Sequence, residues 1–175
     1  MAILETLEWK KSKEERMRKD SRGFSLIELL IVVAIILIIA AIAIPNLLRS
    51  RIAANQASAV GSLRTINTAE ITYASTYNAG YTTALSDLAP PSSGQPTATA
   101  AGLIDSVLAG GVKSGYSFVY LAGSSVGGRI DTYGLNANPV TVGTTGTNYY
   151  FTDHSGVIRQ NSTGTASASD SPLAG

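Results

Sequence analysis

An unbroken apolar run near the start of the chain constrains its fold more than any other feature. From Leu29 to Ile44 the 175-residue sequence contains only Leu, Ile, Val and Ala. A helix from Phe24 to Leu48 would be about 37 Å long, whereas the hydrocarbon core of a bilayer is about 30 Å thick. The run therefore predicts a helix that crosses a membrane.

One carboxylate stands at the head of this run, at Glu28. An ionisable side chain at membrane depth costs about 2.5–3.5 kcal/mol on insertion scales, so such residues are rare and mark function. Glu28 is therefore expected to have a partner.

The charges are distributed unevenly around the run. Seven of the 13 basic residues precede it: Lys10, Lys11, Lys13, Arg16, Arg18, Lys19 and Arg22. The positive-inside tendency places residues 1–23 in the cytoplasm and the rest outside, although Arg49 and Arg51 weaken the asymmetry. A basic leader, an apolar run and Ala41-Ile42-Ala43 also match a secretory signal peptide. A secretory signal, a plain membrane anchor and a specialised leader all remain open from the pattern alone.

Composition excludes several classes of function. Beyond Gly23 six basic residues face seven acidic ones, so there is no basic field for nucleic acid. The chain has no cysteine, which excludes disulfides, thiolate zinc sites and iron–sulfur clusters. The sequence indicates no cofactor, no metal and no catalytic residue, and we expect a protein that is not an enzyme.

Helical spacing continues beyond the apolar run. One narrow stripe at 100° per residue contains Leu48, Ile52, Ala59, Leu63, Ile66, Tyr73 and Tyr77. Pro45 lies inside this pattern and predicts a kink rather than a stop. Glu70 falls on the stripe, so either it has a partner or the stripe serves two surfaces. We expect the helix to end at 78–80, with Gly80 as a left-handed cap.

The rest of the chain predicts smaller elements. Leu103 to Leu108 has helical spacing before two glycines, and four runs are typical of strands: 116–121, 129–135, 148–152 and 157–160. Short links predict an antiparallel sheet. The expected fold class is α+β, divided into a leader (1–23), a transmembrane helix (24–48), an amphipathic helix (49–80), a globular region (81–160) and a flexible tail (161–175).

The N-terminal pattern resembles the type IV pilin and type II secretion pseudopilin superfamily. The resemblance rests on Gly23-Phe24-Ser25-Leu26-Ile27-Glu28, the apolar run and Pro45. It implies a long helix packed on a small antiparallel sheet in a lollipop shape. It further implies cleavage between Gly23 and Phe24 by a membrane prepilin peptidase, with N-methylation of Phe24 by the same enzyme.

The resemblance also implies a partner for Glu28, namely the terminal amine of an adjacent Phe24 or of its own chain. Pairing two charges removes most of the penalty that each carries alone. Glu28 then sets register between subunits. Many pilins close a C-terminal loop with a disulfide, which this chain cannot form. This departure leaves open how its C-terminal region is held, and it fits pilins that rely on hydrogen bonds or pseudopilins that use calcium.

Several other residues have simpler expected roles. We expect His154 to be a turn residue within 153–156, and Asp131 and Asp153 to act as caps rather than calcium ligands. The tyrosines at 73, 77 and 81 are expected to bury against the sheet rather than to conduct electrons.

The sequence predicts a structural subunit that polymerises into an extracellular helical filament with many copies of itself. Its expected partners are the prepilin peptidase and methyltransferase and an inner-membrane assembly machinery. It would be a single-pass inner-membrane protein before assembly and a filament at the cell surface afterwards. One alternative is a pseudopilin in a periplasmic pseudopilus of a type II secretion system. Another, of a different class, is a membrane-anchored or secreted monomeric binding domain.

Overall fold

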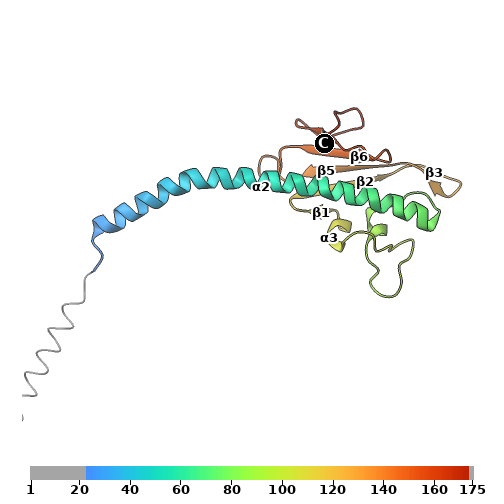
Figure 1. The fold of residues 1–175 in the computed structure, drawn as a ribbon, viewed down its shortest axis with the longest axis horizontal. Helices are drawn as coiled ribbons and strands as arrows, with labels where there is room; N and C mark the ends of the chain where they lie inside the picture. The colour runs from blue at the N-terminus through green and yellow to red at the C-terminus, as the bar shows by residue number, and fades with distance from the viewer. Residues whose placement is uncertain (1–22, 174–175) are drawn as a thin grey trace, which may run out of the picture. The chain divides into compact units, whose positions relative to one another are not determined.

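The computed structural model describes residues 23–173 (Figure 1). The chain divides into two compact units, one up to Pro45 and one from Asn46 onward. The predicted leader lies outside the described residues except for Gly23. Helix α2 (Leu26–Tyr77) has 52 residues and contributes to both units. Its most apolar 18 residues have a mean hydropathy of 3.3, so the helix is long and apolar enough to cross a membrane.

In the second unit α2 packs on a five-stranded antiparallel sheet. The strands are β1 (Val112–Lys113), β2 (Tyr116–Ala122), β5 (Tyr133–Pro139), β6 (Tyr149–Asp153) and β7 (Arg159–Asn161), in the order β1-β2-β5-β6-β7. A separate hairpin joins β3 (Ser125–Val126) to β4 (Arg129–Ile130). The predicted α+β class, a long helix followed by a small antiparallel sheet, is confirmed.

The core lies between α2 and one face of this sheet. The period of two along β2 buries Tyr116 and Phe118 and exposes Val119 and Leu121. The buried cluster comes from α2, the following segment and the inward strand positions. It includes Ala59, Leu63, Ile66, Tyr73, Leu88, Leu108, Tyr116, Phe118, Leu135 and Tyr150. The apolar stripe on α2 thus faces the sheet from Ala59 onward.

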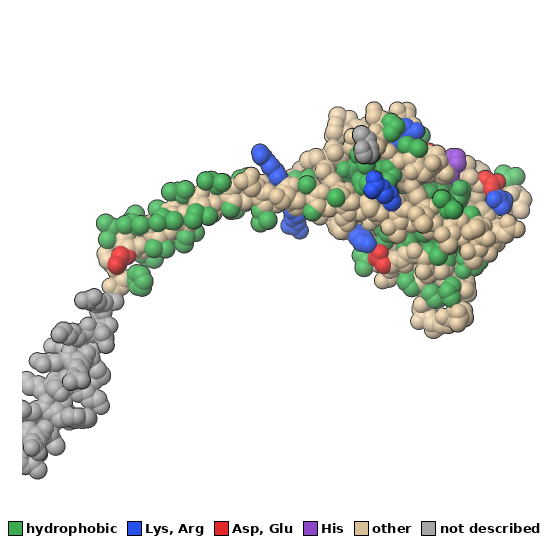
Figure 2. All heavy atoms as spheres, in the orientation of Figure 1, with side chains coloured by type: hydrophobic (Ala, Val, Ile, Leu, Met, Phe, Trp, Pro, Cys, Tyr) green, Lys and Arg blue, Asp and Glu red, His purple; other side chains and the backbone are tan. Residues whose placement is uncertain are grey.

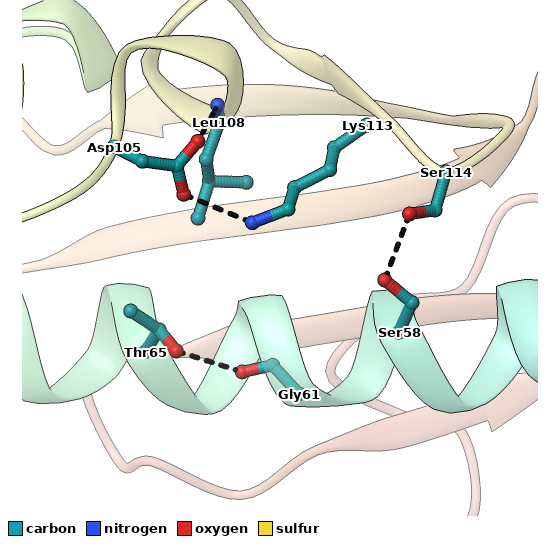
Figure 3. A network of polar contacts seen from close by, with 7 residues as sticks. All are labelled: Ser58, Gly61, Thr65, Asp105, Leu108, Lys113 and Ser114. Carbon is teal, nitrogen blue, oxygen red and sulfur yellow. Dashed lines mark hydrogen bonds and ion pairs between the residues drawn. The ribbon is translucent and has the colours of Figure 1, made fainter.

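Two short helices connect α2 to the sheet: the 3-10 helix η1 (Leu85–Leu88) and α3 (Ser106–Ala109). The Asp105 carboxylate caps α3, since it accepts a hydrogen bond from the Leu108 amide at 3.0 Å and pairs with Lys113 at 2.9 Å (Figure 3). In the same view Ser58 of α2 donates to Ser114 at 2.9 Å. α3 is shorter than the predicted 103–108 helix because the Asp105 cap starts it at Ser106.

The end of α2 differs from the prediction in one respect. The left-handed residue directly after the helix is Asn78, with φ of 52°, and not Gly80. Gly80, with φ of 79°, instead permits a close backbone approach, because a Cβ there would lie 2.0 Å from the Ile130 carbonyl oxygen. Tyr81 donates its amide to that oxygen at 2.7 Å.

The predicted strand 129–135 is divided in two. β4 ends at Ile130 and belongs to the small hairpin, whereas β5 begins at Tyr133 in the main sheet. Between them the Thr132 carbonyl accepts from the Gly123 amide at 2.8 Å, which extends the pairing of β5 with β2 beyond Ala122 and Tyr133.

The C-terminal segment also differs from the expected flexible tail. Residues 162–173 fold back over the sheet, with Ala166 only 3% exposed and its carbonyl accepting a hydrogen bond from the side-chain amide of Asn136 at 2.6 Å. Leu173 donates to Ile158 at 2.8 Å, and Asp170 binds Asn161 at 2.9 Å. Low complexity does not prevent order here because backbone and short polar side chains close these contacts.

Candidate functional site

The candidate site is the first unit from Gly23 to Pro45. Every Phe, Leu, Ile and Val side chain from Phe24 to Ile44 is between 45% and 86% exposed. Figure 2 draws this surface as a continuous hydrophobic covering with an acidic side chain near its start. A monomeric soluble protein rarely exposes so long an apolar surface, so this helix requires lipid or other protein chains around it.

Glu28, the single carboxylate at the head of the apolar run, caps the start of α2. The Glu28 carboxylate accepts a hydrogen bond from the Ser25 amide at 2.8 Å. Ser25 precedes the first helical residue, and Glu28 lies in the first turn, where a negative charge suits the helix dipole. Within one chain, therefore, the partner of Glu28 is a backbone N–H. No cationic group among the described residues pairs with it.

Sequence reasoning missed this role of Ser25. The signal was present, because Ser25-Leu26-Ile27-Glu28 has the spacing of a capping box immediately before an apolar run. The same residues were interpreted only as part of the N-terminal motif.

The predicted processing residues lie just outside the helix. Gly23, Phe24 and Ser25 have no regular secondary structure, and Phe24 is 86% exposed. A Cβ at Gly23 would meet no atom within 4 Å. The bond between Gly23 and Phe24 is thus accessible and not protected by helical hydrogen bonds.

Pro45 lies inside α2, which is assigned as helix without interruption through this position. The helix therefore does not stop at Pro45, as expected. Pro45 has no amide hydrogen to donate, so the helix lacks one bond there.

The other predicted residues form no further site. His154 is exposed in the turn after β6, and Gly156 closes that turn with φ of 74°. Asp153 accepts from the Ser155 amide at 2.9 Å, and Asp131 pairs with Arg129. Within residues 23–173 there is no group of three His, Asp or Glu side chains positioned to hold a metal.

The tyrosines at the end of α2 pack as expected. Tyr73 is 6% exposed and donates its hydroxyl to the Ala98 carbonyl at 2.9 Å. Tyr77 lies beside it, with ring centroids 4.8 Å apart, and Tyr81 meets Tyr133 edge to face at the same separation.

Glu70, which the sequence left unexplained, has a partner. It is completely buried, and its carboxyl group contacts both the amide and the hydroxyl of Thr82, at 3.0 and 2.6 Å. Burial raises the pKa of Glu70 above its ordinary value of 4.5, against the lowering effect of these hydrogen bonds.

The chain thus has an exposed apolar helix with a capping carboxylate in its first turn, followed by an α+β domain. These features define a class of proteins whose helix is inserted in a membrane or packed against other helices. The model of the prokaryotic N-terminal methylation motif matches residues 18–44. The start of this chain therefore carries the prokaryotic N-terminal methylation motif.

Two relatives are each similar to part of the chain. The type IV major pilin protein PilA of Myxococcus xanthus is 49% identical over 55 residues, which are 31% of this chain and 25% of that protein. The type IV wide pilus major component PilA4 of Thermus thermophilus is 62% identical over 37 residues, 21% of this chain and 28% of its own. The matched region thus spans about a quarter of each relative. No solved structure matches the chain.

Proposed function

We propose that this protein is a structural subunit of a type IV pilus-like filament, held together by its N-terminal helices. The observation that carries the proposal is the apolar surface from Phe24 to Ile44, whose large apolar side chains are all at least 45% exposed. Before assembly lipid covers this surface, and in the filament the helices of neighbouring copies cover it. Contacts between unlike surfaces that do not close into a ring generate such a fibre.

Processing precedes assembly in this proposal. A prepilin peptidase cuts the exposed bond between Gly23 and Phe24 and methylates the new amine of Phe24. The subunit is then anchored in the inner membrane by α2 until assembly machinery extracts it into a filament at the surface. The proposal is supported by the methylation motif at residues 18–44 and by two relatives named as a major pilin and a major pilus component, whose matches cover 31% and 21% of this chain.

The new amine supplies a cation for Glu28. The Glu28 carboxylate holds only the exposed Ser25 amide among the described residues, so it retains capacity to bind an ammonium group of a neighbouring Phe24. Pairing inside a bundle of apolar helices relieves the desolvation of both charges. Glu28 therefore acts as a register device between subunits and not as a catalytic acid.

Mass spectrometry of the protein recovered from cells tests the processing. We expect an N-terminal Phe24 that is about 14 Da heavier than the unmodified residue, the mass added by one methyl group. A mature chain that begins at Ile44 would instead establish the signal-peptide interpretation.

Electron microscopy of cells with and without the gene tests the filament. We expect surface filaments that disappear on deletion and that contain the mature chain. A monodisperse membrane monomer in cells that express the protein normally would refute the proposal, and co-purification with an outer-membrane secretion channel would assign the subunit to a pseudopilus instead.

A further inference from the structure

The most unusual polar group in the second unit is Glu70, because it is fully buried and no cation accompanies it. Among residues 23–173 the only ion pairs are Lys113 with Asp105 and Arg129 with Asp131. The titratable groups that face Glu70 are Tyr73 on the same helix, Asp87 on η1, Tyr120 on β2 and Tyr133 on β5. None of these groups carries a positive charge that would compensate the negative charge of an ionised Glu70.

The contacts around Glu70 form a ring of four hydrogen-bond distances. Thr82 N lies 3.0 Å from Glu70 Oε2, and Thr82 Oγ1 lies 2.6 Å from Glu70 Oε1. Thr82 Oγ1 also lies 3.1 Å from the hydroxyl oxygen of Tyr120, which lies 3.2 Å from the Thr82 carbonyl oxygen. The ring therefore joins α2, the residue Thr82 and strand β2.

The number of hydrogens available to the four contacts of this ring favours a protonated Glu70. With Glu70 ionised, the available hydrogens are the Thr82 amide, the Thr82 hydroxyl and the Tyr120 hydroxyl, which are three for four contacts. One pair of oxygens within 3.2 Å would then face each other without a hydrogen. With Glu70 protonated, its O–H donates to Thr82 Oγ1, Thr82 donates to Tyr120, Tyr120 donates to the Thr82 carbonyl, and all four contacts are satisfied.

We propose that Glu70 is a protonated carboxylic acid in the folded domain, and that it forms with Thr82 and Tyr120 a pH-sensitive latch between the end of α2 and the sheet. Loss of the proton leaves one of the four contacts without a hydrogen. It also places a negative charge in a fully buried position. The segment after α2, which starts at Asn78 and is tied to the sheet through Tyr81 and Thr82, is then the part released. This inference does not depend on the proposed function.

The direction of the pH effect follows from burial. Desolvation raises the pKa of Glu70 in the folded state above 4.5, so the folded domain binds a proton that the unfolded chain has released. The stabilisation is fully present below the unfolded-state pKa. It falls by up to about tenfold in the folding equilibrium constant per pH unit as the pH rises toward the folded-state pKa, and it is lost above that value.

Unfolding of the full chain in detergent micelles, followed by the near-ultraviolet circular dichroism of its tyrosines between pH 5 and 8, tests the latch. The wild type should lose stability as the pH rises. Glu70→Gln should be insensitive to pH, because its amide N–H₂ donates to Thr82 Oγ1 as the acid does and its oxygen accepts from Thr82 N. Wild-type behaviour in Glu70→Gln would overturn the proposal.

Asp105→Asn is the matched control, since it removes another carboxylate of the same domain. Its ion pair with Lys113 lowers the pKa of Asp105 below its ordinary value of 3.8, so this group stays ionised throughout the range tested. The control should keep the downward slope of the wild type.

Infrared spectroscopy detects the proton directly. At pH about 6, where an ordinary glutamate is ionised, the wild type should show a carboxylic acid carbonyl band that Glu70→Gln lacks and Asp105→Asn retains. An identical spectrum for wild type and Glu70→Gln in this region would refute protonation.

Tyr120→Phe provides a second variant if Glu70→Gln does not fold. Without the Tyr120 hydroxyl Glu70 loses a hydrogen bond that lowers its pKa, so the carboxylic acid band should persist to higher pH than in the wild type. A band that titrates at the same pH in Tyr120→Phe would exclude the hydrogen ring.

Discussion

Substitution of Glu28 distinguishes a cap of its own helix from a charged contact between subunits. Glu28→Gln retains an oxygen that accepts from the Ser25 amide but removes the charge. Glu28→Leu removes both and matches the surrounding apolar surface. Glu28→Gln thus keeps the hydrogen bond from Ser25 within one chain, whereas Glu28→Leu loses it. Both variants lose the proposed ion pair with Phe24 of a neighbouring chain.

The magnitudes of the two contacts are different. The hydrogen bond from Ser25 to Glu28 is 2.8 Å long and exposed, and a typical neutral hydrogen bond contributes about 0.5–1.5 kcal/mol. Loss of one partner of a buried ion pair costs about 3–5 kcal/mol, which is more than a hundredfold in an association equilibrium. If pairing with Phe24 drives assembly, both variants should form few filaments at equal protein level. If only the cap matters, Glu28→Gln should assemble normally.

The assay is the yield of sheared filaments relative to total cellular protein, with cleavage after Gly23 verified for each variant. Asp105→Asn, which changes an exposed charge far along the sequence from Glu28, serves as the control and should assemble. Normal filament yield from Glu28→Leu would refute the register role of Glu28.

Two further predictions concern the backbone. Gly80→Ala should destabilise the second unit by several kcal/mol in thermal unfolding, because its Cβ would lie 2.0 Å from the Ile130 oxygen. Gly94→Ala, with a similar φ of 83° but open space around it, should cost only about 1–2 kcal/mol, and equal effects would contradict the collision. In a filament map we expect the helix to be interrupted at Pro45, because the proline lacks a donor there. A straight and continuous helix from Leu37 to Ile52 would contradict this.

Local patterns were sufficient to predict much of the molecule. Residue periodicity predicted the helix from 26 to 77 and most strand positions, and the position of a glycine predicted the turn at 153–156. Both signals depend on only a few neighbouring residues. The candidate assembly segment was also predicted from sequence, because an apolar run with one carboxylate has few physical solutions. Ser25 was identifiable in principle, since a cap depends only on residues three positions apart.

The sequence by itself determined the apolar helix, its single charge at Glu28 and the alternating pattern of the strands. Only the tertiary structure decided the sheet order, the division of residues 129–135 between two sheets, the ordered C-terminal segment and the partner of Glu70. These depend on contacts between residues distant in sequence. Thr82, for example, lies 12 positions from Glu70 and 38 from Tyr120, and the hydrogen ring exists only when α2 and β2 are brought together. No local sequence pattern predicts these contacts, because they contribute to the stability of the fold only when segments distant in sequence pack together in one buried region.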